Sequence, residues 1–206
     1  MRDLKIDKKS RRLDGKKYYK TKYTKTQIIL GSTNRYDNFY YLNQKSKIGG
    51  GSKDSNAYTI SREGIIYEHF DPKYYTDFMG DKSIDKGSIS VMLENMGGLT
   101  YNFLTDTYRN WENKDCDDNL KYEKRSKGFQ YWESYTEKQI KSTFDLSRYL
   151  LDEFSIENSC IGNNKIVASD SIEFFNGVVC RSNYSVDYLD LNDSFDFREL
   201  MNVIEI

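Results

Sequence analysis

The stretch of residues 136–154 constrains the fold most, because it is the one stretch with a complete helical signature. Thr136 and Gln139 have the spacing of a capping box, which favours a helix start. Apolar and small residues then recur at helical spacing along one face. They are Ile140, Phe144, Ser147, Leu150, Leu151 and Phe154. The pattern predicts a long amphipathic helix.

Short apolar runs of strand length precede this helix. Residues 26–30 (TQIIL) end at Gly31, as a buried strand would, and residues 88–93 (SISVML) predict a second strand. Residues 57–70 (AYTISREGIIYEHF) contain two strand-like runs on either side of Gly64. A turn between such runs favours glycine, so this stretch predicts a β-hairpin.

The rest of the chain gives weaker signals. Residues 45–56, with three consecutive glycines, predict a loop, and the polar residues 105–130 predict an inserted excursion. Residues 158–170 predict another loop, residues 172–180 a strand or turn, and residues 195–203 a closing helix. Strands mixed with helices at this size predict an α/β domain, with a central mixed β-sheet flanked by helices.

The length of 206 residues suits one domain with an additional arm. A hydrophobic content of 37% and an aromatic content of 15% exclude a disordered chain. The sequence has no apolar run long enough to span a bilayer, and its first residues lack the apolar stretch of a signal peptide. We therefore expect a product made in the cytoplasm, with no membrane partner.

Charge divides the chain into a basic arm, residues 1–25, and an acidic body, residues 26–206. The arm has eleven Lys or Arg residues and three Asp residues, a charge of +8, which leaves −9 for the body. Such an arm could bind an anionic polymer, either nucleic acid or a wall polymer, with Tyr18, Tyr19 and Tyr23 stacking on bases. The alternatives are a solvated tail and a segment that packs on a partner.

The cysteines Cys116, Cys160 and Cys180 form no metal-binding or redox pair. We predict three plain thiols, with a disulfide between Cys160 and Cys180 as the alternative.

Four stretches, in order, resemble the type 2 N-acetylmuramoyl-L-alanine amidases. Residues 27–33 (QIILGST) are similar to the family's opening strand, and residues 57–67 (AYTISREGIIY) to its hairpin. Residues 88–95 (SISVMLEN) are similar to a further strand, and residues 190–197 (DLNDSFDF) to the closing motif. The helix of residues 136–154 lies where the family has a long helix. The resemblance implies an amidase-like domain that acts on peptidoglycan.

The resemblance also implies hydrolysis of the amide between muramic acid and the stem peptide, by zinc with three protein ligands and an open position. It places these ligands at Gly31, Asn163 and Asp190, of which only Asp190 has a metal-binding side chain. His69 is the single histidine of the whole sequence, so a monomer cannot build a site with two histidines. We therefore expect no zinc cofactor.

Other groups are candidates for a catalytic or binding role at the same site. The resemblance places a strand glutamate at Met92 and a lysine at Tyr188, and Glu94 shares the strand face of Met92. Glu94, with Asp190, could serve as a catalytic acid or base, although a solvated strand-end acid is the alternative. The predicted substrate-binding residues are Tyr58, Asn95, Asn163 and Arg181.

Three further interpretations remain open. His69 is either structural or part of an improvised metal site with Asp190 and Glu94 or a cysteine. Arg181, with Asn183 and Tyr184, could contact a stem-peptide carboxylate. A final set of aromatic residues could stack on sugars or belong to the core. It comprises Phe70, Tyr74, Tyr75 and Phe78.

Three functions follow from these observations. The first is a non-hydrolytic protein that binds peptidoglycan or forms part of a virion; the resemblance and the frequent Lys, Asn and Tyr residues suggest a bacteriophage. The second is an active amidase with a rearranged zinc or acid–base site. The third is a nucleic-acid-binding protein that uses residues 1–25.

Overall fold

The computed structural model describes residues 4–36 and 53–205. The glycine-rich part of the predicted loop of residues 45–56 lies outside the described residues. Among the described residues, no helix is both long and apolar enough to cross a bilayer. All three cysteines are free thiols, as the sequence predicts.

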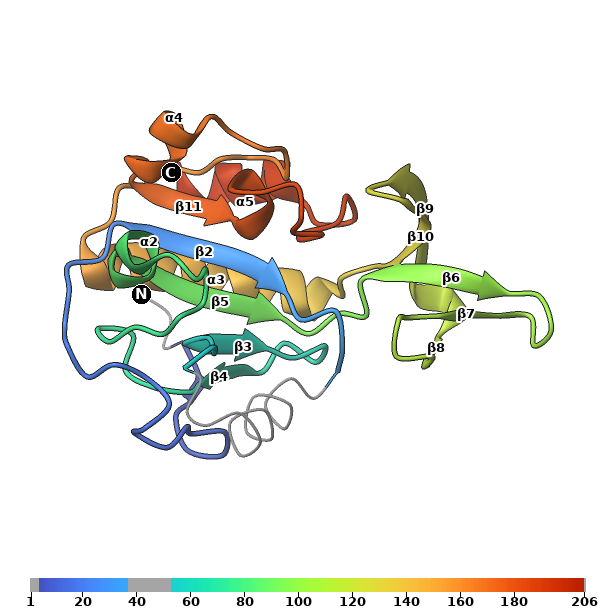
Figure 1. Ribbon diagram of the computed structural model, residues 1–206, viewed down its shortest axis with the longest axis horizontal. Coiled ribbons are helices and arrows are strands. Elements are labelled where there is room, and N and C mark those ends of the chain that lie inside the picture. Colours follow the sequence, from blue (N-terminus) through green and yellow to red (C-terminus); the bar gives the residue numbers. More distant parts are fainter. Residues whose placement is uncertain (1–3, 37–52, 206) are drawn as a thin grey trace.

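A six-stranded mixed sheet forms the centre of the molecule (Figure 1), with the strand order β1-β4-β3-β5-β2-β11. Strands β3, β5, β2 and β11 are parallel to one another, and β3 pairs with β4 in the antiparallel hairpin predicted around Gly64, whose φ is +80°. The mixed sheet confirms the predicted α/β class. Its strands are β1 (Ile6–Asp7), β2 (Gln27–Ser32), β3 (Tyr58–Ile60), β4 (Ile66–Glu68), β5 (Ser88–Leu93) and β11 (Gly177–Cys180).

Helix α3 (Glu137–Phe154) covers one face of this sheet, and α5 (Phe197–Ile204) packs beside it. Ile28 and Leu30 of β2 share a buried cluster with the apolar residues of α3. Because side chains alternate along a strand, Ile29 points to the opposite face, which α2 (Lys82–Gly87) and α4 (Ser169–Glu173) border. Both predicted helices are confirmed.

Only half of the predicted capping box forms at the start of α3. The Thr136 hydroxyl accepts a hydrogen bond from the Gln139 amide at 3.1 Å. The Gln139 side chain instead donates to the carbonyl oxygens of Ile60, at 3.0 Å, and Glu94, at 2.9 Å. Gln139 therefore fixes the helix against the carboxyl ends of β3 and β5.

A second sheet of five antiparallel strands projects from one side of the domain (Figure 1), in the order β8-β7-β6-β10-β9. The predicted excursion of residues 105–130 is therefore largely ordered β-structure. Its strands are short and rich in charge, so they have little of the apolar alternation that identifies a strand in sequence. They are β6 (Gly98–Asn102), β7 (Thr107–Arg109), β8 (Asp115–Cys116), β9 (Lys121–Ser126) and β10 (Phe129–Glu133).

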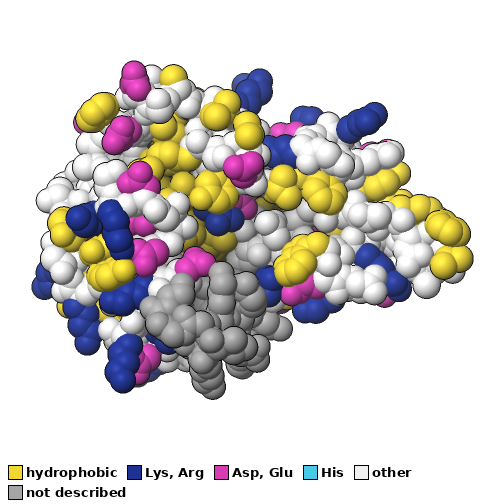
Figure 2. All heavy atoms as spheres, viewed as in Figure 1, with side chains coloured by type: hydrophobic (Ala, Val, Ile, Leu, Met, Phe, Trp, Pro, Cys, Tyr) yellow, Lys and Arg dark blue, Asp and Glu magenta, His cyan; other side chains and the backbone are white. Residues whose placement is uncertain are grey.

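Hydrophobic side chains are exposed on this projecting sheet. Phe103 and Leu104, in the turn between β6 and β7, have exposed fractions of 79% and 80%, and Trp111 is 61% exposed. Figure 2 shows hydrophobic side chains at the outer end of the molecule, where this turn lies. The projecting sheet thus buries only a small cluster of its own, around Met96 and Leu99.

The basic segment before β2 packs on the domain over residues 4–25. Strand β1 extends the central sheet beside β4, and Leu13 is buried in the main core. Arg11 forms an ion pair with Glu94 at 2.7 Å, and Arg12 pairs with Glu68 at 2.8 Å. These two guanidinium groups are therefore bound to carboxylates of the domain.

Candidate functional site

The candidate site lies at the carboxyl ends of the parallel strands, on the sheet face opposite α3. Gly31 of β2 is the register partner of Met92 of β5. Gly31 shares its face with Ile29, two residues earlier. Arg181 follows directly after β11. The ends of parallel strands are where open α/β sheets usually bind ligands.

Asp190 is completely buried here, and both of its carboxylate oxygens have partners. Oδ1 accepts from the Ser32 amide at 2.8 Å, and Oδ2 accepts from Arg181 Nε at 2.5 Å. Arg181 Nη2 also donates to the Ser32 carbonyl at 3.1 Å. Burial alone would lower the pKa of Arg181, but the adjacent Asp190 carboxylate outweighs it and raises that pKa. The pair is therefore a fixed, charged unit.

Gly31 provides the space that the Arg181 side chain needs. A Cβ atom at position 31 would lie 2.8 Å from Arg181 Nε and 2.7 Å from Met92 Sδ. The guanidinium carbon of Arg181 also lies 5.3 Å from the ring centre of Phe78 and 4.8 Å from that of Tyr188. Arg181 thus fills the region between the position of Gly31 and the Asp190 carboxylate.

The residues at this place do not fit the zinc ion that the resemblance implies. Gly31 has no side chain, and the Asp190 carboxylate is bound to Arg181. The side chain of Asn163 is exposed and accepts from the Lys165 amide at 2.9 Å. Within residues 4–36 and 53–205, no group of three or more His, Cys, Asp or Glu side chains is arranged to hold a metal ion.

Glu94 and Asn95 are engaged in contacts that stabilise the fold. Glu94 is buried and bound to Arg11, so it is not the solvated strand-end acid of the alternative interpretation. The Asn95 amide donates to the Glu133 carbonyl at 3.1 Å and accepts from the Gly97 amide at 2.8 Å. The Glu94 side chain thus holds the basic segment, and the Asn95 side chain lies at the junction of the two sheets.

Of the other predicted binding residues, only Arg181 lies beside Asp190. Tyr58 is buried, and its hydroxyl contacts Glu68 at 3.1 Å. The Asn183 amide donates to the carbonyl oxygens of Asn163 and Lys165 at 2.9 and 2.7 Å, which fixes the preceding loop. The Tyr184 hydroxyl bonds to Gln27.

His69 joins the basic segment to the central sheet and is completely buried. Its Nδ1 lies 2.7 Å from the Arg11 carbonyl, which can only accept, so Nδ1 carries the proton. Burial lowers the pKa of His69, which favours the neutral ring, and in that ring Nε2 accepts from the Thr59 hydroxyl at 2.7 Å. That hydroxyl accepts from Asn56 at 2.9 Å. This network assigns His69 a structural role as a neutral imidazole.

The burial of His69 should make stability depend on pH. Burial lowers the pKa of His69 from 6.5 to about 4. The contribution of the neutral His69 to the free energy of unfolding is complete above pH 6.5. It is lost as pH falls toward 4, because only the unfolded chain binds a proton at His69 between these two pH values. We expect a loss of about 3 kcal/mol. Urea titrations of the protein and of His69→Gln measure this loss. The difference between their free energies of unfolding should shrink from about pH 7 to about pH 4, and a constant difference would contradict the prediction.

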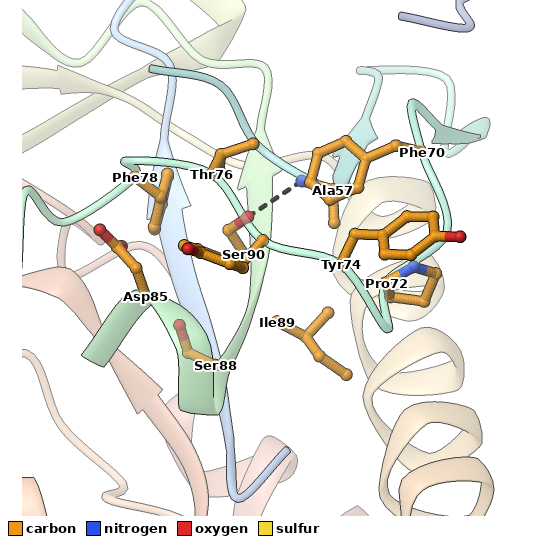
Figure 3. A pocket seen from close by; sticks show the side chains of 11 residues that line it. Ala57, Phe70, Pro72, Tyr74, Thr76, Phe78, Asp85, Ser88, Ile89 and Ser90 are labelled. Atoms are coloured by element: carbon orange, nitrogen blue, oxygen red, sulfur yellow. Dashed lines mark hydrogen bonds between the residues drawn. The ribbon is translucent and has the colours of Figure 1, made fainter. Parts of the chain in front are cut away.

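The aromatic residues Phe70, Tyr74, Tyr75 and Phe78 surround a cavity of only about 10 Å³ (Figure 3). Such a volume holds a single water molecule and is far too small for a sugar ring. Phe70 and Tyr75 are buried, and Tyr18 stacks on Phe70 with ring centres 4.9 Å apart. The core interpretation of this cluster is therefore the one that the structure supports.

Lys127 is a site residue that the sequence did not indicate. Its amine donates to the carbonyl oxygens of Tyr188 and Asp190 at 3.1 and 3.2 Å. It lies in the β9–β10 turn, where Lys127 and Gly128 have φ values of +47° and +87°. The Lys-Gly pair signals a turn, but only the folded chain brings that turn of the projecting sheet to Asp190.

The similarity of this chain to known proteins lies in its fold. No protein-family profile and no curated protein matches the chain. Among solved structures, the amidase LysC of Clostridium intestinale URNW matches 98% of both chains, with 13% identity and a TM-score of 0.53. Staphylococcus aureus AmiA, in complex with its ligand, matches 97% of this chain and 81% of its own, with 12% identity and a TM-score of 0.54.

A third similar structure is the Escherichia coli amidase AmiD in complex with anhydro-N-acetylmuramic acid-L-Ala-D-gamma-Glu-L-Lys. It matches 90% of this chain and 60% of its own, with 14% identity and a TM-score of 0.52. Identities this low show the fold and not the activity. Over nearly its whole length, the chain has the fold of the type 2 N-acetylmuramoyl-L-alanine amidases.

Proposed function

We propose that this protein binds peptidoglycan through its amidase-like groove and does not carry out zinc-dependent hydrolysis. One observation carries the proposal: Asp190, the only side chain at the three implied ligand positions that could bind zinc, is buried and neutralised by Arg181. A carboxylate that is already bound at 2.5 Å to a fixed cation is not available to a metal ion.

The likeness to peptidoglycan amidases supports the choice of ligand. The AmiD structure contains a muramoyl peptide, which is the kind of molecule that we propose for this groove. We extend the proposal to a wall-binding or structural component of a bacteriophage virion. One similar structure, from Clostridium intestinale URNW, is described as an endolysin, and the frequent Lys, Asn and Tyr residues suggested a phage from sequence.

The other two functions receive less support. An acid–base or metal site built from His69, Glu94 and Asp190 would need three side chains that are each committed to other partners. Binding of nucleic acid through residues 1–25 would lack two of the segment's cations, because Arg11 and Arg12 are paired with Glu94 and Glu68.

A sedimentation assay with purified sacculi tests the proposal. We expect the protein to sediment with sacculi, to release no stem peptides, and to retain well under one equivalent of zinc after incubation with zinc and dialysis. Staphylococcus aureus AmiA serves as the hydrolytic control under the same conditions. Release of stem peptides together with about one bound zinc per chain would refute the absence of hydrolysis, and failure to sediment would refute wall binding.

A further inference from the structure

One edge of the Arg181 guanidinium faces inward, and the other is left for a ligand. Guanidinium carries five N–H donors in one plane. The Nε and Nη2 edge binds Asp190 and the Ser32 carbonyl. Among the described residues, Nη1 has no hydrogen-bond partner. It also does not belong to the polar atoms that are both fully buried and unpaired. The Arg181 side chain is 16% exposed, and we infer that the outer edge of Nη1 and Nη2 is the part that a ligand can reach.

The surroundings hold this outer edge in one orientation. Asp190 is itself fully buried and fixed by the Ser32 amide. The rings of Phe78 and Tyr188 lie beside the guanidinium, and Gly31 leaves room for its stem. A donor pair that is fixed before the ligand arrives loses little conformational entropy on binding.

We propose that Arg181 binds a carboxylate of the ligand, at the place where the resemblance puts the zinc ion. The outer Nη1 and Nη2 hydrogens would donate to the two oxygens of one carboxylate, an arrangement that the planar fork matches and a lysine cannot reproduce. The inference rests on the proposed function, because muramoyl peptides such as the one bound to AmiD carry free carboxylates. Asp190 orients the fork and does not contact the ligand.

Two muramoyl peptides test this assignment by calorimetry. One is N-acetylmuramoyl-L-Ala-D-γ-Glu-L-Lys, and the other is the same molecule with every carboxylate converted to a carboxamide. We expect the carboxylate form to bind about tenfold to a hundredfold more tightly, as charge-assisted hydrogen bonds typically provide. In Arg181→Lys, which keeps a cation for Asp190, this preference should largely disappear. Arg148→Lys, on the exposed face of α3, is the matched control and should keep it.

The outcomes separate this inference from the proposed function. Equal affinity for the two peptides, or no binding of either while sacculi still bind, overturns the carboxylate site and leaves wall binding intact. If the protein does not bind sacculi either, a titration with acetate, followed through the NMR resonance of Arg181 Nε–H, decides whether Arg181 binds a carboxylate. If this resonance shifts more than that of Arg148, the carboxylate site at Arg181 is supported although wall binding is refuted. If it does not, the carboxylate site is overturned as well.

Discussion

Replacing Arg181 with methionine should lower the free energy of unfolding by about 3–5 kcal/mol, because it leaves a fully buried carboxylate without its cation. Asp190 has an exposed fraction of 0%, and Arg181 is its only ion-pair partner among the described residues. Methionine fills much of the same volume, so the loss reports on the charge more than on a cavity. Urea denaturation monitored by circular dichroism measures the change.

The double variant Arg181→Met/Asp190→Asn is the decisive control. It removes both charges, and an asparagine can still accept from the Ser32 amide, so most of the lost stability should return. The double-mutant cycle isolates the interaction energy between Arg181 and Asp190. Arg148→Met, on an exposed part of α3, should change stability by less than about 0.5 kcal/mol. If Arg181→Met alone cost under about 1 kcal/mol, Asp190 would not depend on Arg181.

Replacing Glu133 with alanine should have a comparable effect, because this completely buried side chain joins the projecting sheet to the domain. Its carboxylate accepts from the Met96 amide at 2.6 Å, binds the Tyr36 hydroxyl, and pairs with Arg62 at 3.2 Å. Removing it leaves Arg62, whose side chain is 11% exposed, without this carboxylate. We expect a loss of about 3–5 kcal/mol.

Hydrogen exchange should show where the Glu133→Ala variant is weakened. The amides of β6 and β10 should exchange faster, whereas β2 and β5 in the central sheet should keep more of their protection. Glu123→Ala, on the exposed face of β9, is the matched control and should leave exchange unchanged. Uniform loss of protection in both sheets would show instead that the projecting sheet and the domain unfold as one unit.

The two variants examine different parts of one arrangement. Lys127, in the β9–β10 turn of the projecting sheet, donates to the carbonyl of Asp190. Glu133, at the other end of β10, anchors the same sheet. The projecting sheet therefore contacts the candidate site through Lys127, and its exposed Phe103 and Leu104 lie in the turn between β6 and β7.

Local patterns in the sequence were sufficient for the elements that bury a continuous apolar stripe. The strand before Gly31, the hairpin around Gly64 and the helix begun by Thr136 form within a residue or two of their predicted positions. Each depends on side-chain periodicity or on a backbone conformation that glycine favours, and both can be read over a few neighbouring residues.

Composition alone also restricted the chemistry, because one histidine in the whole sequence excludes a two-histidine site within a single chain. What only the tertiary structure decided is which charges meet. Arg181 reaches Asp190 because β11 pairs with β2, which brings Ser32 and its backbone to the same corner, and Arg11 reaches Glu94 across 83 positions of sequence. Ion pairs between distant segments have no period along the chain, so the sequence lists the charges but the packing of strands selects the partners.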